Sequence, residues 1–239
     1  LAPRRMPLWA AVTKYLVPSL CERIVRDAAA VLSARYYLRE GIADGVFQKI
    51  TRDVAIAGIF EGTQLVQLSL IASLLGRLEK TGRRDPEPVD LERLCDLGTP
   101  APAWDPSGTR LRVGDPGGDE LVERWFGGAR EPAVGSRAIA ALRTLEAQRR
   151  GCGGEDFTQA RVHCRLHAAA CCLQIWRSNR DRLAHAAGGE WLAPCLERLA
   201  GGEDWAPAGT DLAGPAFDWM LHQFERGELF SITPLELAR

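Results

Sequence analysis

The sequence predicts an all-α protein built as helix bundles, and three observations support this prediction. Apolar residues recur at spacings of three and four along several segments, which is the pattern of one buried helix face. No segment alternates convincingly between apolar and polar residues, and no repeat of fixed period is present. Proline and glycine cluster at residues 83–118, where six of the 14 prolines fall, and this cluster separates two helical regions.

Three helices are expected before the proline-rich segment. The first covers residues 10–38, although Pro18 would kink it or occupy its first turn. Gly41 and Gly45 then break the chain, and residues 46–59 form a short second helix. The third covers residues 64–78, with Thr63 as the N-terminal cap. The apolar face of the first helix carries Leu16, Leu20, Ile24, Ala28, Val31 and Leu32.

The remaining elements follow from the same periodicity. The proline-rich segment holds at most one short helix, at residues 89–97. Glycine-rich breaks separate the helical patterns beyond it. These patterns cover residues 120–126, 136–149, 155–187, 190–200 and 215–226.

Composition excludes several classes of protein. The 239 residues are 46% hydrophobic. The net charge of −1 gives the protein no general positive electrostatic field that would attract nucleic acid or an anionic membrane. The longest apolar stretch, at residues 65–75, is too short for a transmembrane helix, and no secretory signal is visible. Seven cysteines, two of them adjacent, suit a reduced compartment. We therefore expect a soluble, cytoplasmic protein.

The segment 52–67 is the part of the chain that carries chemistry. It places the carboxylate of Glu61 between an apolar run and the start of a helix, and flanking Ile59 and Phe60 would partly desolvate it and make it a base. Gly62 would let the backbone approach a ligand, and the helix start offers unpaired N–H groups. The residues alone leave a second interpretation open, in which Glu61 is an ordinary first-turn acid and Thr63 only a cap.

The order of these residues resembles the signature near the C-terminal end of acyl-CoA dehydrogenases. Arg52-Asp53 is followed seven residues later by an aromatic-Glu-Gly-Thr-x-x-x-Gln run that begins at Phe60. The likeness extends upstream to Lys14 in an Ala-rich helix and to the runs 31–36 and 47–53. It covers roughly residues 8–80, a third of the chain.

The resemblance implies a flavin-dependent oxidoreductase that acts on an acyl thioester of CoA or of a carrier protein. Glu61 would be the catalytic base that removes the α-proton while the β-hydride passes to FAD. The backbone N–H of Glu61, with a flavin hydroxyl, would polarise the thioester carbonyl. Phe60 would lie beside the substrate, and Gly62 and Thr63 would contact FAD. Arg52 and Asp53 would form a structural ion pair.

The chain departs from the family in three places. Ser33, Ala34 and Arg35 stand where the family has glycines that lie against FAD, so the adenine end would be held differently or not at all. Gln64-Leu65-Val66 replaces the common Asn-Glu-Ile, which removes a polar cofactor contact. The stretch between Tyr37 and Arg52 is longer than usual.

The resemblance also implies a division of the chain. Residues 1–82 would be the last helices of the family's four-helix bundle, 83–118 a linker, and 119–239 the helical extension of the long members. We expect the missing flavin-domain segment upstream of Leu1 or on a partner chain, and a dimer or hetero-oligomer as the complete unit. The alternative is a non-catalytic structural or assembly subunit, or a degenerate relative, that completes a partner's site.

Other residue groups favour structural roles. His163, His167 and Cys171 share a helix face but lack the further ligands of a metal site, so no metal is expected. Cys164 and the adjacent Cys171 and Cys172 fit buried thiols better than nucleophiles. The charged run 177–182 predicts a solvated face. The tryptophans expected to anchor the C-terminal core are Trp125, Trp176, Trp191 and Trp219.

Overall fold

The computed structural model describes residues 2–40, 43–81, 88–103, 118–127, 134–152, 157–181, 189, 191–202 and 213–228. The secondary-structure elements in these ranges are all α-helices or 3₁₀ helices, which confirms the all-α prediction. None of the described helices is long and apolar enough to cross a membrane. Most of the predicted linker lies outside these ranges.

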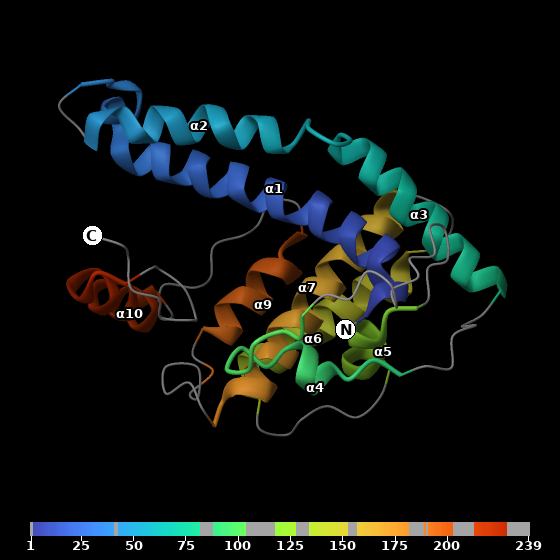
Figure 1. The fold of residues 1–239 in the computed structure, drawn as a ribbon. Coiled ribbons are helices and arrows are strands. Elements are labelled where there is room, and N and C mark those ends of the chain that lie inside the picture. Colours follow the sequence, from blue (N-terminus) through green and yellow to red (C-terminus); the bar gives the residue numbers. More distant parts are fainter. Residues whose placement is uncertain are drawn as a thin grey trace.

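The N-terminal part consists of three helices. Helix α1 (Met6–Leu32) begins four residues earlier than predicted, so Pro18 lies in its middle, and the helix continues through it. A short 3₁₀ helix, η2 (Ser33–Tyr37), follows. Helix α2 (Val46–Ala57) returns beside α1, and α3 (Gln64–Thr81) continues from α2 at a changed angle (Figure 1).

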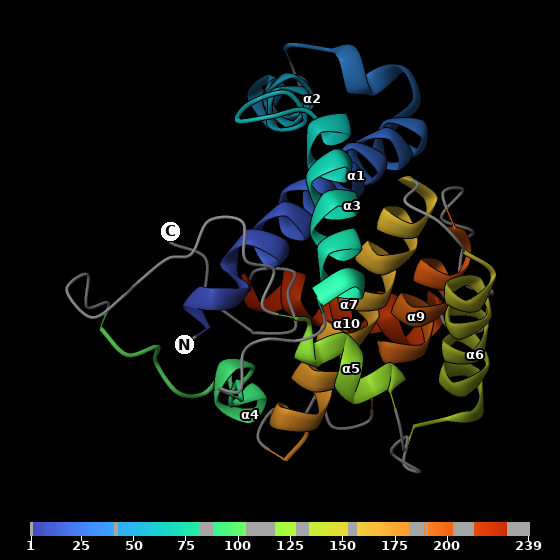
Figure 2. The same cartoon turned by 90° about the vertical axis from the view of Figure 1, so that its right-hand side faces the viewer.

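The C-terminal part lies below the hairpin that α1 and α2 form in Figure 1. Its central helix is α7 (Phe157–Asn179), shorter than the predicted 155–187. Around α7 pack α5 (Glu120–Phe126), α6 (Ser136–Gly151) and α9 (Leu192–Ala200), and α6 lies beside α9 (Figure 2). Helix α10 (Ala213–Arg226) lies at the edge.

Two hydrophobic clusters hold the described helices together. The larger one lies among α5, α6, α7 and α9 and contains Trp125 and Trp176, as predicted; Trp191 packs against it. The smaller one joins Leu8 and Val12 of α1 and several leucines of α3 to Cys164 of α7. The predicted N-terminal and C-terminal parts therefore share a core along α7.

A buried ion pair connects the same two parts. Nε of Arg5 lies 2.8 Å from both carboxylate oxygens of Glu120, and the Arg5 side chain is only 1% exposed. A buried charge is stable only with a partner, so this contact ties the start of α1 to the start of α5.

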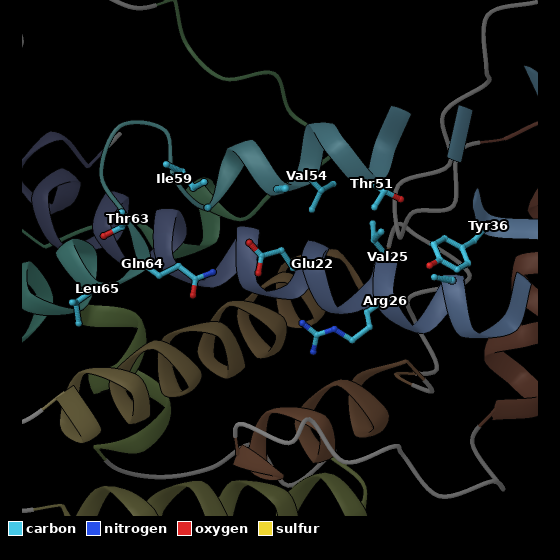
Figure 3. A pocket seen from close by; sticks show the side chains of 13 residues that line it. Glu22, Val25, Arg26, Tyr36, Thr51, Val54, Ile59, Thr63, Gln64 and Leu65 are labelled. Atoms are coloured by element: carbon cyan, nitrogen blue, oxygen red, sulfur yellow. The ribbon is translucent and has the colours of Figure 1, made fainter. Parts of the chain in front are cut away.

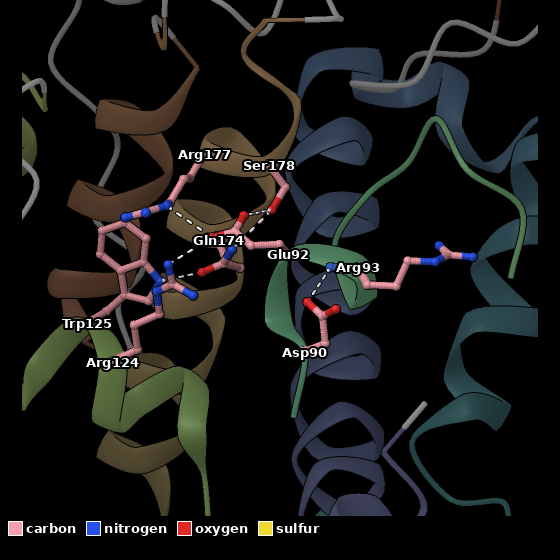
Figure 4. A network of polar contacts seen from close by, with 8 residues as sticks. All are labelled: Asp90, Glu92, Arg93, Arg124, Trp125, Gln174, Arg177 and Ser178. Carbon is pink, nitrogen blue, oxygen red and sulfur yellow. Dashed lines mark hydrogen bonds and ion pairs between the residues drawn. The ribbon is translucent and has the colours of Figure 1, made fainter. Parts of the chain in front are cut away.

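The short helix α4 (Leu91–Leu94) anchors the described part of the predicted linker. Its Glu92 accepts hydrogen bonds from Arg124 at 2.8 Å and from the hydroxyl of Ser178 at 2.8 Å, and Arg177 lies 3.1 Å away (Figure 4). The prediction that 177–182 is a purely solvated face is therefore wrong at its start. These side chains instead meet a carboxylate that lies more than 80 residues away in the sequence.

Candidate active site

The candidate site is the turn between α2 and α3. The amides of Ile59 and Phe60 both donate to the carbonyl of Ile56, at 3.0 and 2.9 Å. The next two residues, Glu61 and Gly62, have φ angles of +56° and +103°. A left-handed conformation is rare for a residue with a side chain, so the chain turns sharply at Glu61 before α3 begins.

Three contacts hold this turn. Oγ1 of Thr63 accepts from the amide of Val66 at 3.4 Å, which is the predicted cap of α3. The side-chain amide of Gln67 donates through Nε2 to the carbonyl of Glu61 at 3.4 Å. From α1, Nζ of Lys14 donates to the carbonyl of Ala57 at 2.8 Å and satisfies the end of α2.

The side chains around the candidate base are open to solvent. Ile59 is 69% exposed, Phe60 is 64% exposed, and Glu61 belongs to the exposed class. The expectation that the apolar neighbours desolvate Glu61 is therefore wrong for the chain by itself. Ile59 and Phe60 precede Glu61 in the turn, and neither belongs to the two hydrophobic clusters of the described residues. Only an additional covering surface would exclude water from the carboxylate.

A groove runs along this turn between α1 and α2. Its volume is about 710 Å³, and it extends from Tyr36 at one end to Thr63, Gln64 and Leu65 at the other (Figure 3). Its walls are mostly aliphatic. Of the predicted site residues, Thr63 lines the groove, and Gly62 and Glu61 precede it in the chain.

Glu22 of α1 is a second carboxylate in this groove, and sequence reasoning missed it. Figure 3 shows its side chain extending from α1 toward the α2–α3 turn. A Cβ built on Gly58 would lie 2.6 Å from Oε1 of Glu22, so the carboxylate lies directly over that glycine. No signal in the sequence marks Glu22, because its place depends on how α1 packs against α2.

The predicted Arg52–Asp53 ion pair does not form. Asp53 pairs with Lys49, and Arg52 donates to the Gln48 side chain at 3.3 Å; both contacts connect residues four apart on the surface of α2. These side chains stabilise the helix that precedes the turn. They do not contact Glu61 in the described structure.

The histidines on α7 form a buried cluster with Asp119. Nδ1 of His167 lies 2.8 Å from Oδ2 of Asp119, and Nε2 of His163 lies 3.0 Å from the same oxygen. Burial by itself would lower the pKa of His167, but the Asp119 carboxylate outweighs it and raises the pKa to about 10. Burial opposes the charge of Asp119 too, yet the two histidines hold its pKa well below the usual range.

Asp119 of this cluster also contacts the start of α5. The described residues contain no group of three or more His, Cys, Asp or Glu arranged to hold a metal ion. Oδ1 of Asp119 also accepts from the amide of Val122 at 3.3 Å and caps α5. Burial raises the pKa of the Cys164 thiol to about 12, which agrees with its predicted role as a small hydrophobic residue.

The surface of the turn has polar groups and a glycine that face solvent. Thr63 presents an exposed hydroxyl, Gly62 has no side chain, and the first N–H groups of α3 have no acceptor within the helix. Gly62 has a φ angle of +103°, which residues with a side chain rarely adopt, so the glycine suits the turn itself. The exposed residues Ser33, Ala34 and Arg35 lie in η2. They occupy the positions at which the resembled family has glycines.

Comparison with known proteins supports the resemblance in this part of the chain. Residues 2–76 match the family described as acyl-CoA dehydrogenase, C-terminal domain. The matched range contains α1, α2, the turn with Glu61 and most of α3. Neither a search of curated proteins nor a search of solved structures finds a significant match to the chain.

Proposed function

We propose that residues 2–76, which match the acyl-CoA dehydrogenase C-terminal domain, supply the catalytic base of a flavin-dependent acyl-thioester dehydrogenase. Glu61 accepts the α-proton of the acyl thioester, and the electrons of that C–H bond form the new double bond. FAD, when bound, supplies the acceptor for the β-hydride. The acyl carrier is CoA or a carrier protein.

The geometry of the turn is the observation that supports this proposal. The left-handed conformations at Glu61 and Gly62 place a carboxylate immediately before the N-terminus of α3. There the N–H of Glu61 would donate to the thioester carbonyl and stabilise the charge that develops as the α-proton leaves. Phe60 would cover the acyl chain, and Gly62 and Thr63 would contact the edge of the flavin.

This proposal requires a second part of the enzyme. The elements of the described residues include no β-domain that could cover a flavin. The α2–α3 turn and the C-terminal half of α1 expose large apolar side chains. Val31 of α1 is 86% exposed, and Phe60 of the turn is 64% exposed. A flavin-domain segment, on the same polypeptide or on a partner chain, would cover these side chains and desolvate Glu61.

A non-catalytic role is the second candidate, and one observation favours it. The glycines expected to lie against FAD are replaced by Ser33, Ala34 and Arg35, and Ser33 itself has a φ angle of +52°. In this candidate the chain keeps the helical scaffold and completes the site of a partner. Glu61 would then have no part in proton transfer.

Flavin spectroscopy on the assembled protein separates the two candidates. The chain is produced with its flavin-domain segment or partner, and the flavin absorbance is recorded during titration with acyl-CoA. The proposal predicts that substrate bleaches the flavin and that Glu61→Gln abolishes bleaching while the flavin remains bound. Glu22→Gln is the matched control, because it neutralises the other carboxylate of the groove.

Each outcome decides between assignments. Bleaching that survives Glu61→Gln and is lost in Glu22→Gln would identify Glu22 of α1 as the base. A stable assembly that binds no flavin would contradict the dehydrogenase proposal and support the structural role.

A further inference from the structure

A second cavity lies where α6 and α9 begin, far along the chain from Glu61. Its volume is about 260 Å³, several times the ~30 Å³ of one water molecule. The first residues of α6, the first residues of α9 and Trp176 of α7 contribute to its wall. The lining residues are Val134, Gly135, Ser136, Arg137, Ala138, Trp176, Gly189, Leu192 and Ala193.

The start of α6 lines this cavity. Its N-cap residue is Gly135, which has no side chain to accept from the helix, and the first backbone bond runs from Ile139 to the Gly135 carbonyl at 3.1 Å. The N–H groups of Ser136, Arg137 and Ala138 therefore have no acceptor within the helix. Such a helix start carries a partial positive charge.

The start of α9 points its partial charge at the same cavity. Leu192 already donates to the carbonyl of Gly189 at 3.0 Å, and the first helical bond joins Cys195 to Trp191 at 3.3 Å. The N–H of Ala193 lies between them without an acceptor in the helix. Because α6 has 16 residues and α9 has nine, both helices are long enough for their dipoles to act at this point.

The indole of Trp176 is the third donor. This side chain is 5% exposed, and its Nε1 is buried without a hydrogen-bond partner. Leaving a buried donor unpaired is unfavourable, and native structures rarely do so. Gly189, at φ +66°, lies over this atom, and a Cβ there would be 3.0 Å from Nε1. Because Gly189 and Trp176 both line the cavity, this unpaired donor lies at the cavity wall.

One of the lining residues of this cavity is an arginine. Arg137 lines it and pairs with Glu197 at 2.8 and 3.1 Å, so part of its charge is shared. The guanidinium of Arg180 lies over the Trp176 ring, 5.2 Å from its centroid. Two helix starts, an indole N–H and the guanidinium of Arg137 thus lie around a space of small-ligand size.

We propose that this cavity binds a phosphate group, either free phosphate or the phosphate of a small phosphomonoester. Helix N-termini bind oxyanions through their free N–H groups. The convergence of two such termini favours a doubly charged anion over a carboxylate. The indole N–H of Trp176 donates to one phosphate oxygen, and Ser136 and Ala193 donate through their backbone.

Nitrogen-15 NMR of the full chain tests this proposal with a built-in control. Inorganic phosphate is titrated at constant ionic strength, with sodium acetate and phenyl phosphate as separate arms. The Trp176 indole signal, assigned from Trp176→Phe, is expected to shift saturably with phosphate. The indole of Trp125 donates to Gln174 at 3.2 Å and is expected to stay in place. Phenyl phosphate binding as tightly as phosphate would identify a phosphomonoester site.

Substitutions at Ser136 distinguish the backbone donor from the hydroxyl. Ser136→Pro removes the N–H at the first helical position, where proline is well tolerated, and Gly135 at ψ 158° suits a following proline. Ser136→Pro is expected to weaken phosphate binding on the order of tenfold. Ser136→Ala keeps the N–H and retains most of the affinity. The Trp125 signal reports whether each variant is folded.

Three results would overturn the proposal. The Trp176 signal could fail to move at high phosphate, which would leave a cavity that holds only water. Acetate could shift it as strongly as phosphate, which would remove the preference for phosphate. Equal affinity of Ser136→Pro and Ser136→Ala would show that the start of α6 does not contribute.

Discussion

At the scale of single residues, the α2–α3 turn depends on backbone conformations that few residues adopt. Glu61 and Gly62 have positive φ angles in succession, and the Gln67 side chain fills the space beside Gly62. A carboxylate-bearing residue in the left-handed region is costly by about 1–3 kcal/mol. Such local strain is typical of a functional turn and agrees with the proposed role of Glu61.

Gly62→Val is expected to disrupt this turn. A branched side chain cannot adopt the glycine's φ of +103° without strain. Its Cβ would also lie 2.8 Å from Nε2 of the Gln67 side chain. We expect a loss of about 1–3 kcal/mol in the free energy of unfolding, measured by urea denaturation. Gly151→Ala, at the end of α6 with nothing within 4 Å of the new Cβ, is the control and stays within about 1 kcal/mol of the parent. An undisturbed Gly62→Val would show that this turn is not constrained.

The His167–Asp119 pair makes stability depend on pH. The pKa of His167 is raised to about 10, so its stabilising contribution is complete below about pH 6.5 and disappears as the pH rises through about 10. The lowered pKa of Asp119 means that its contribution disappears only in acid, below about pH 3.8. The pair therefore stabilises the fold most between these limits, around pH 4–6.5.

Urea denaturation between pH 6.5 and 10 tests this linkage. The free energy of unfolding of the parent is expected to fall with rising pH more steeply than that of His167→Gln, because the variant has no proton to lose at this position. His222→Gln changes an exposed histidine of α10 and is expected to keep the parent's slope. Parallel slopes for the parent and His167→Gln would contradict the prediction.

At the scale of elements, α1 has two halves in different surroundings. Its first half is buried against α3 and α7, through Leu8, Ala11, Val12 and Leu16. Its second half forms a hairpin with α2 and exposes Ile24 at 62% and Val31 at 86%. The same apolar periodicity thus runs through a packed segment and an unpacked one, and the contact of Arg5 with Glu120 anchors the packed end.

Removing one partner of the Arg5–Glu120 pair is expected to destabilise the protein strongly. Glu120→Gln removes the negative charge that pairs with the buried guanidinium of Arg5, at a cost of about 3–5 kcal/mol. The double variant Arg5→Met/Glu120→Gln is expected to cost less than the sum of the single variants, and a double-mutant cycle of unfolding free energies measures the difference. Lys49→Met breaks an exposed pair on α2 and is expected to cost less than about 1 kcal/mol. Additive costs for Arg5 and Glu120 would argue against coupling between α1 and α5.

At the scale of the whole molecule, the core crosses the predicted boundary between the two helical parts. Leu68, Ile71 and Leu74 of α3 belong to one cluster with Ala160 and Cys164 of α7. Because α7 also carries much of the larger cluster, loss of packing at α3 is transmitted to the C-terminal helices. The described helices are therefore expected to unfold together rather than as two independent units.

Leu74→Ala tests this cooperation. Leu74 is fully buried, so the truncation leaves a cavity and costs about 2–5 kcal/mol. The indole NMR signals of Trp9 on α1 and Trp125 on α5 are expected to disappear at the same, lowered urea concentration. Leu70→Ala, which changes a half-exposed leucine of the same helix, is expected to shift both midpoints less. A Trp125 midpoint that stays at the parent's value would show that the two parts unfold separately.

Much of the secondary structure could be predicted because helix formation depends on local signals. Apolar periodicity and the caps at Thr63, Asp90 and Asp119 mark helix boundaries to within a few residues. Two helices depart from these local signals. Helix α1 continues through Pro18, and α7 ends at Asn179, whose side chain bonds the backbone of residues 95 and 97 at 2.8 and 2.9 Å.

By itself, the sequence determined the helical class, the order of the helices and the segment that carries Glu61, because periodicity, capping and a short motif are written in neighbouring residues. Only the tertiary structure decided which polar groups meet. Glu22 reaches the Glu61 turn, Asp119 joins the two histidines of α7, and two helix starts converge on Trp176. These contacts join residues far apart in the chain. Their partners are chosen by helix packing, which no local pattern encodes.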